Sequence, residues 1–175
     1  MSSLNKKLIN IFGSYQDFPE KGIIFCDILP VLRDIKVFDE LIESMSKASF
    51  IHNSDALIAI DARGFIFGTA IAYKVKKPLV LARKPGKLPG EVFEESYSLE
   101  YGENRLCIQK ESIKEFKSFS IIDDLLATGG TARCVEKLLK DQGKLVNGLS
   151  VVVELANLEG YKNLECDVIC QVKLD

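Results

Sequence analysis

Two adjacent carboxylates, Asp123 and Asp124, stand shortly before a run of small residues. The apolar run at residues 119–122 is rich in β-branched side chains and typical of a buried parallel strand, which we expect to end at the carboxylates. After the small residues, apolar side chains recur at helical spacing from Ala132 to Leu139. The small residues between strand and helix are Ala127, Thr128, Gly129, Gly130 and Thr131.

This order of elements can hold a phosphorylated sugar. Glycines let the backbone approach a phosphate, and the first amides of a helix lack partners of their own, so they can donate to it. Asp123 and Asp124 can accept hydrogen bonds from vicinal ribose hydroxyls or help to hold a metal ion. Gly130 stands where a P-loop needs lysine, which argues against a nucleoside triphosphatase. A plain tight turn or a solvated loop stays open as the alternative.

A second strand is also followed by charged residues. Residues 57–60 form an apolar run that ends at Asp61 and Arg63, before a helix predicted over residues 65–75. Ligands of open α/β sheets bind at the carboxyl ends of strands, where Arg63 could contact a diphosphate through two hydrogen bonds. A surface ion pair is the other interpretation.

A third apolar run, at residues 79–82, leads into cations that lie among prolines and glycines: Arg83, Lys84 and Lys87. No acidic residue stands between these cations, so they repel each other unless a polyanion binds. The proline and glycine content favours a mobile connection over a helix. The segment is either a lid over an anion or a solvated basic loop.

An apolar segment interrupted by helix breakers comes early in the chain. Pro19 and Gly22 break regular structure, but the following residues 23–25 are too apolar for an ordinary surface loop. They either pack into the core or cover an apolar ligand. On both sides of this segment, amphipathic helices are predicted at residues 3–12 and 36–49, with a packing role.

The stretch from Ile121 to Thr131 resembles the phosphoribosyl pyrophosphate signature of the type I phosphoribosyltransferases. With Ala127, the signature resembles that of the branch that acts on adenine, since the enzymes for 6-oxopurines and orotate usually carry Asp at this position. The early apolar segment resembles this branch's hood over the base. The resemblance implies that Phe25 stacks on the purine and that backbone groups near Ile24 and Cys26 read its edge, although the family commonly has Arg in place of Cys26.

The resemblance also implies a reaction: transfer of the 5-phosphoribosyl group from phosphoribosyl pyrophosphate to adenine, giving AMP and pyrophosphate. It assigns Arg63 to the pyrophosphate, often with a cis peptide before the arginine, and the basic loop to a lid. It makes Glu100 and Tyr101 candidates for proton transfer at the base, because Ala127 cannot take a proton. It further implies a homodimer and Mg²⁺ held through pyrophosphate and ribose oxygens, with no metal ligand assigned directly.

The alternation of strands and helices predicts an α/β fold, with a mostly parallel sheet and helices on both faces. Further strands are expected at residues 149–153 and 168–172. The length of 175 residues suits one domain, residues 1–175, with the hood at about 18–35 and the mobile lid at about 83–100.

Composition excludes several other classes of protein. The net charge of -2 gives no general drive toward nucleic acid or membrane, and no apolar run suggests a membrane span or signal peptide. The cysteines lack Cys-x-x-Cys spacing and His52, on an expected polar loop, is the single histidine, which disfavours a zinc site, a disulfide framework and a histidine-based triad. Reduced thiols in a cytoplasmic protein fit better; they are Cys26, Cys107, Cys134, Cys166 and Cys170.

Three other functions stay open. The base could be another purine, such as xanthine or hypoxanthine. The chain could be a regulator that binds a phosphoribosyl group without catalysis. A structural α/β protein would leave the basic loop and the apolar hood without a purpose.

Overall fold

The computed structural model describes residues 3–18, 20–22, 24–99 and 102–175. Its centre is a five-stranded sheet in the order β4-β3-β7-β8-β9, and every neighbouring pair is parallel. The strands are β3 (Ala56–Ile60), β4 (Leu79–Ala82), β7 (Ser118–Leu126), β8 (Leu145–Leu155) and β9 (Asp167–Leu174). The predicted parallel sheet is confirmed.

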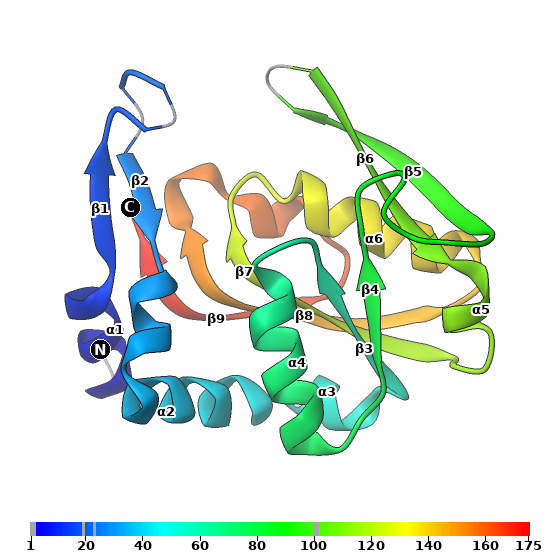
Figure 1. Cartoon of the computed structure of the whole chain (residues 1–175), viewed down its shortest axis with the longest axis horizontal. Coiled ribbons are helices and arrows are strands. Elements are labelled where there is room, and N and C mark those ends of the chain that lie inside the picture. The colour runs from blue at the N-terminus through cyan, green and yellow to red at the C-terminus, as the bar shows by residue number, and fades with distance from the viewer. Residues whose placement is uncertain (1–2, 19, 23, 100–101) are drawn as a thin grey trace.

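Helices cover both faces of this sheet, as predicted (Figure 1). One apolar core packs α1 (Ser3–Ile11), α2 (Ile35–Ser46), α3 (Ser49–Asn53) and α4 (Gly64–Val75) against the sheet. The other core packs α6 (Gly130–Asp141) and the short α5 (Lys110–Ile113) against the opposite face. Three 3-10 turns complete the helical elements of the described chain: η1 (Leu29–Arg33), η2 (Ala156–Leu158) and η3 (Gly160–Asn163).

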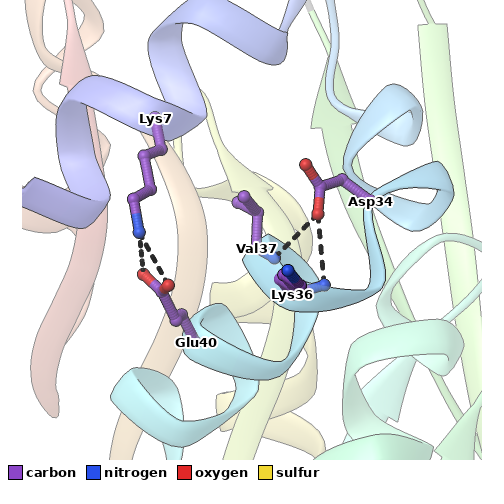
Figure 2. A network of polar contacts seen from close by, with 5 residues as sticks. All are labelled: Lys7, Asp34, Lys36, Val37 and Glu40. Atoms are coloured by element: carbon purple, nitrogen blue, oxygen red, sulfur yellow. Dashed lines mark hydrogen bonds and ion pairs between the residues drawn. The ribbon is translucent and has the colours of Figure 1, made fainter.

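The start of α2 is fixed by a side-chain cap. Asp34 Oδ1 accepts hydrogen bonds from the amides of Lys36 and Val37, both at 3.1 Å, which satisfies donors that a helix start leaves unpaired (Figure 2). Lys7 on α1 reaches Glu40 on α2 at 2.6 Å and joins the two helices at the surface (Figure 2).

Two antiparallel hairpins stand beyond the central sheet. The first pairs β1 (Gly13–Gln16) with β2 (Ile24–Asp27), and the second pairs β5 (Val92–Leu99) with β6 (Gly102–Gln109). Figure 1 shows both hairpins projecting toward the carboxyl ends of the parallel strands, one at each side of the molecule. The predicted hood therefore contains β2 and η1, and the predicted lid ends in β5.

Three expectations about local structure were wrong. β7 does not end at the acidic pair, because β8 keeps pairing with it through Leu126 although pairing with β3 stops at Ile122. The helix predicted at residues 36–49 stops at Ser46. His52 lies in helix α3 rather than on a polar loop, since Phe50 and Ile51 are buried in the core and hold that turn in place.

Candidate functional site

A cavity of about 420 Å³ lies at the carboxyl ends of the parallel strands. It is lined by the loop after β3, the start of the basic loop after β4, the acidic pair on β7 and the start of α6. Nine of the predicted site residues meet at this cavity. The predicted residues that line the cavity are Arg63, Lys84, Asp123, Asp124, Ala127, Thr128, Gly129, Gly130 and Thr131.

The acidic pair is buried at the floor of this cavity, with Asp123 8% and Asp124 6% exposed. The amide of Asp124 donates to Asp123 Oδ1 at 2.9 Å. Burial, and then the neighbouring Asp124 carboxylate, raise the pKa of Asp123 well above its usual range. Burial also raises the pKa of Asp124, although the Arg63 guanidinium opposes this rise. Ionising both carboxylates is therefore unfavourable unless a ligand compensates.

Arg63 is the charge that lies nearest to this pair. Its Nη2 atom is 2.8 Å from Asp124 Oδ2, but this buried oxygen accepts no well-aligned hydrogen bond. The contact is thus an ion pair without a hydrogen bond. Asp124 Oδ2 can still accept a hydrogen bond from a ligand.

The turn between β3 and α4 brings backbone close to Asp123. A Cβ atom on Gly64 would lie 2.8 Å from Asp123 Oδ1 and 3.0 Å from the carbonyl oxygen of Ile122, so only glycine fits at the helix start. The peptide bond between Asp61 and Ala62 is cis, which agrees with the cis peptide that the family resemblance implied in this loop.

The basic loop has an acidic partner that its own sequence does not contain. Arg83 Nε lies 3.1 Å from Asp61 Oδ2, and its Nη1 donates to the carbonyl oxygen of Lys87 at 3.3 Å. The Arg83 backbone also exchanges hydrogen bonds with Cys107 on β6, at 2.9 and 2.7 Å. Among the described residues of this loop, Lys84 lines the cavity whereas Arg83 and Lys87 do not.

The hood residues lie beside the cavity rather than in its wall. Ile24 is 68% exposed, so this side chain does not pack into the core. The Phe25 ring centroid lies 5.6 Å from the Arg63 guanidinium carbon, which places the ring next to the diphosphate candidate. Burial and the nearby Asp27 raise the pKa of the Cys26 thiol, so this thiol is neutral at physiological pH. Glu100 and Tyr101 lie outside the described residues.

The sequence did not reveal what supports the loop before α6. Gly129 has φ +84°, and a Cβ atom there would lie 2.4 Å from the carbonyl oxygen of Gly160. A Cβ atom on Gly160 would in turn lie 2.0 Å from the carbonyl oxygen of Ala127. The side chain of Asn163 donates to the carbonyl oxygen of Thr128 at 2.8 Å. The glycine at position 160 is the one local signal that the sequence offers for this contact.

Known proteins share both the fold and the sequence. The family described as phosphoribosyl transferase domain matches residues 33–172, so the chain belongs to the phosphoribosyltransferases. It is 57% identical to an adenine phosphoribosyltransferase of Prochlorococcus marinus (strain MIT 9215), over 97% of this chain and 99% of the relative. Within the phosphoribosyltransferases, the chain belongs to the adenine phosphoribosyltransferase family.

Solved structures agree with this placement. The adenine phosphoribosyltransferase of Thermoanaerobacter pseudethanolicus is 40% identical, with a TM-score of 0.92 and coverage of 98% of this chain and 100% of that one. The enzyme of Saccharomyces cerevisiae is 32% identical, with a TM-score of 0.90 and coverage of 98% and 99%. The yeast structure holds an imino-altritol bisphosphate and adenine.

Across the described part of the chain, none of the helices combines the length and the apolar character that crossing a bilayer requires.

Proposed function

We propose that this protein transfers the 5-phosphoribosyl group of phosphoribosyl pyrophosphate to adenine, releasing AMP and pyrophosphate in purine salvage. The observation that carries the proposal is one cavity that joins a buried acidic pair, a glycine loop at a helix start and cationic loops from two further strands. Relatives that share 57% and 40% of their residues with the chain are adenine phosphoribosyltransferases.

The sugar would be held by β7 and the loop that follows it. Residues 127–131 would grip the 5′-phosphate, since this loop leads into the unpaired amides at the start of α6. Asp123 and Asp124 would accept hydrogen bonds from the 2′ and 3′ hydroxyls. As pyrophosphate leaves, positive charge grows at the anomeric carbon, and carboxylates held rigidly by a strand stabilise it.

The leaving group would be neutralised by cations from two loops. Arg63, Arg83, Lys84 and Lys87 are proposed to bind pyrophosphate. In the structure Arg63 pairs with Asp124 and Arg83 with Asp61, so a diphosphate must replace these carboxylates. Replacing Asp124 as the partner of Arg63 would also free that carboxylate to bind the ribose.

Adenine would lie against the hood. Phe25 is proposed to stack on the purine, with backbone groups near Ile24 and Cys26 reading its edge. Glu100, with Tyr101, is proposed to manage the proton at the base, because the alanine at position 127 cannot.

Mg²⁺ is proposed as the cofactor. The described residues contain no cluster of three or more His, Cys, Asp or Glu side chains that could hold a metal, so substrate oxygens would supply most of its ligands. The unused hydrogen-bonding capacity of Asp124 Oδ2 fits a role facing a ribose-bound cation. When bound, Mg²⁺ neutralises charge on hard oxygen ligands. We further propose a cytoplasmic homodimer.

The function is tested by pyrophosphate release from phosphoribosyl pyrophosphate and Mg²⁺, with adenine, hypoxanthine, guanine and xanthine offered separately. We expect release with adenine alone. Release with another base would keep the reaction and change the substrate. Binding without release for every base would assign the chain to the regulators.

We expect Arg83→Ala to weaken pyrophosphate binding about tenfold, because a charged hydrogen bond contributes about 1.5–3 kcal/mol. Titration calorimetry with pyrophosphate and Mg²⁺ measures this effect. Arg105→Ala is the matched control, since Arg105 is 58% exposed and pairs with Glu94, which does not line the cavity, whereas Arg83 pairs with Asp61, which does. Equal loss in both variants would contradict a specific role for Arg83.

A further inference from the structure

We call residues 127–131, before and at the start of α6, the phosphate loop. Residues 156–165, between β8 and β9, form a segment that packs against the phosphate loop from outside the cavity. We define them as the bracing segment. None of its residues lines the cavity that holds the acidic pair, yet two of them contact the backbone of the loop at residues 127–129. We propose that Asn163, together with Gly160, is a positioning residue that sets the orientation of the phosphate loop. This inference rests on the proposed function of that loop.

The first contact is backbone against backbone. The spacing between Gly160 and the loop leaves no room for a Cβ on either side: an added atom on Gly160 would lie 2.0 Å from Ala127 O and 2.8 Å from Gly129 N. Two chain segments this close prevent each other from moving inward. The contact therefore limits where the loop can lie, but it does not by itself fix how its peptides are turned.

The second contact supplies that orientation. Asn163 Nδ2 donates to the carbonyl oxygen of Thr128 at 2.8 Å. This oxygen and the amide of Gly129 belong to one planar trans peptide, so holding the oxygen fixes the plane of the whole unit. The chain enters α6 through this peptide, and the amides of Gly130 and Thr131 follow directly. Their directions depend on it.

The bracing segment is itself held against α6. The amide of Glu165 donates to Glu136 Oε2 at 3.2 Å, and the Glu165 carboxylate pairs with Lys140 at 2.8 Å. Glu136 and Lys140 both lie on α6, beyond its first turn. The segment thus reaches from the loop before α6 to the body of that helix. These contacts with α6 hold the backbone next to Asn163 in place.

The test compares ribose 5-phosphate and pyrophosphate as probes, each titrated calorimetrically into the whole protein. Asn163→Ala should weaken ribose 5-phosphate about fivefold to tenfold, the change that losing one hydrogen bond brings, and leave pyrophosphate unchanged. Asn163→Leu keeps the branched shape of the side chain but not the donor, and should match Ala. Asn163 is exposed, so neither variant opens the core. Lys162→Ala, on the same turn with only a surface ion pair to Glu159, is the control.

The outcomes separate the two proposals. Wild-type protein that binds no ribose 5-phosphate would overturn the proposed function and this inference with it. Wild-type binding with unchanged affinity in Asn163→Ala would overturn the inference alone. Equal weakening of both probes, or recovery in Asn163→Leu, would overturn it as well, because packing rather than the hydrogen bond would then be responsible.

Discussion

Asp123→Asn is expected to raise the melting temperature of the protein while lowering kcat/KM by about 100-fold or more. The loss follows from removing a charged acceptor for a ribose hydroxyl and a negative charge beside the developing cation. The gain follows from burial, because an ionised carboxylate in this position lacks solvation that Asn does not need. We expect a rise of about 3 °C, corresponding to ~1 kcal/mol in a chain of this length.

The stability gain should depend on pH in one direction. Folding raises the pKa of Asp123 above its ordinary 3.8, so the native wild type holds its proton more tightly than the unfolded chain does. Wild-type stability therefore falls as pH rises from about 3.8 through the raised pKa. Asn does not titrate, so the difference in melting temperature should widen with pH and close toward pH 4.

Thermal melts across pH 4 to 8, with steady-state kinetics, measure both effects. Asp141→Asn is the control, because that carboxylate is 53% exposed on α6 and should change neither quantity much. A variant that melts below wild type at neutral pH would contradict the cost we assign to the buried charge. Turnover within tenfold of wild type would remove Asp123 from ribose binding.

Gly129→Ala is expected to lower kcat/KM by more than about 100-fold and to destabilise the protein by ~2–3 kcal/mol. The new Cβ would meet the carbonyl oxygen of Gly160 at 2.4 Å, and the residue would hold φ +84°. Overpacking and left-handed strain each cost about 1–3 kcal/mol. Relief requires the phosphate loop to move, which misplaces the amides at the start of α6.

A second glycine separates the effect of the steric clash with Gly160 from the effect of the positive φ angle. Gly143 has φ +68° with nothing within 4 Å of its added Cβ, and it lies past the far end of α6. Gly143→Ala should therefore cost ~1 kcal/mol and leave kcat/KM unchanged. Urea unfolding and initial-rate kinetics on both variants measure the contrast. Similar kinetic losses in the two would show that strain, rather than contact with Gly160, explains the effect.

Local patterns were sufficient where one element determines its own structure. The apolar run at residues 57–60 and the helical spacing from Ala132 to Leu139 predicted a strand and a helix that the structure confirms. The position of charged residues after strands also predicted that Arg63, Lys84 and the acidic pair would meet, because carboxyl ends of parallel strands share an edge.

Contacts between residues that lie far apart in the sequence could not be predicted from local patterns. The length of β7 depends on how far β8 continues beside it, and the salt bridge of Arg83 depends on where β3 places Asp61. Asn163 carries no chemical signal in its own neighbourhood, since its role arises only when the chain returns past Thr128. Tertiary pairing decided each of these features.

The two ion pairs of the site have a consequence for selectivity among small anions. Arg63 and Arg83 are each neutralised by a carboxylate of the chain, so an anion in solution competes with an internal counter-ion already within 3.1 Å. A ligand that replaces one carboxylate gains little, because it exchanges one ion pair for another. Under the proposed function, phosphoribosyl pyrophosphate would reach several loops at once, and its contacts would add up over a single binding event. We therefore expect the internal counter-ions to disfavour small competitors that reach a single loop, such as inorganic phosphate.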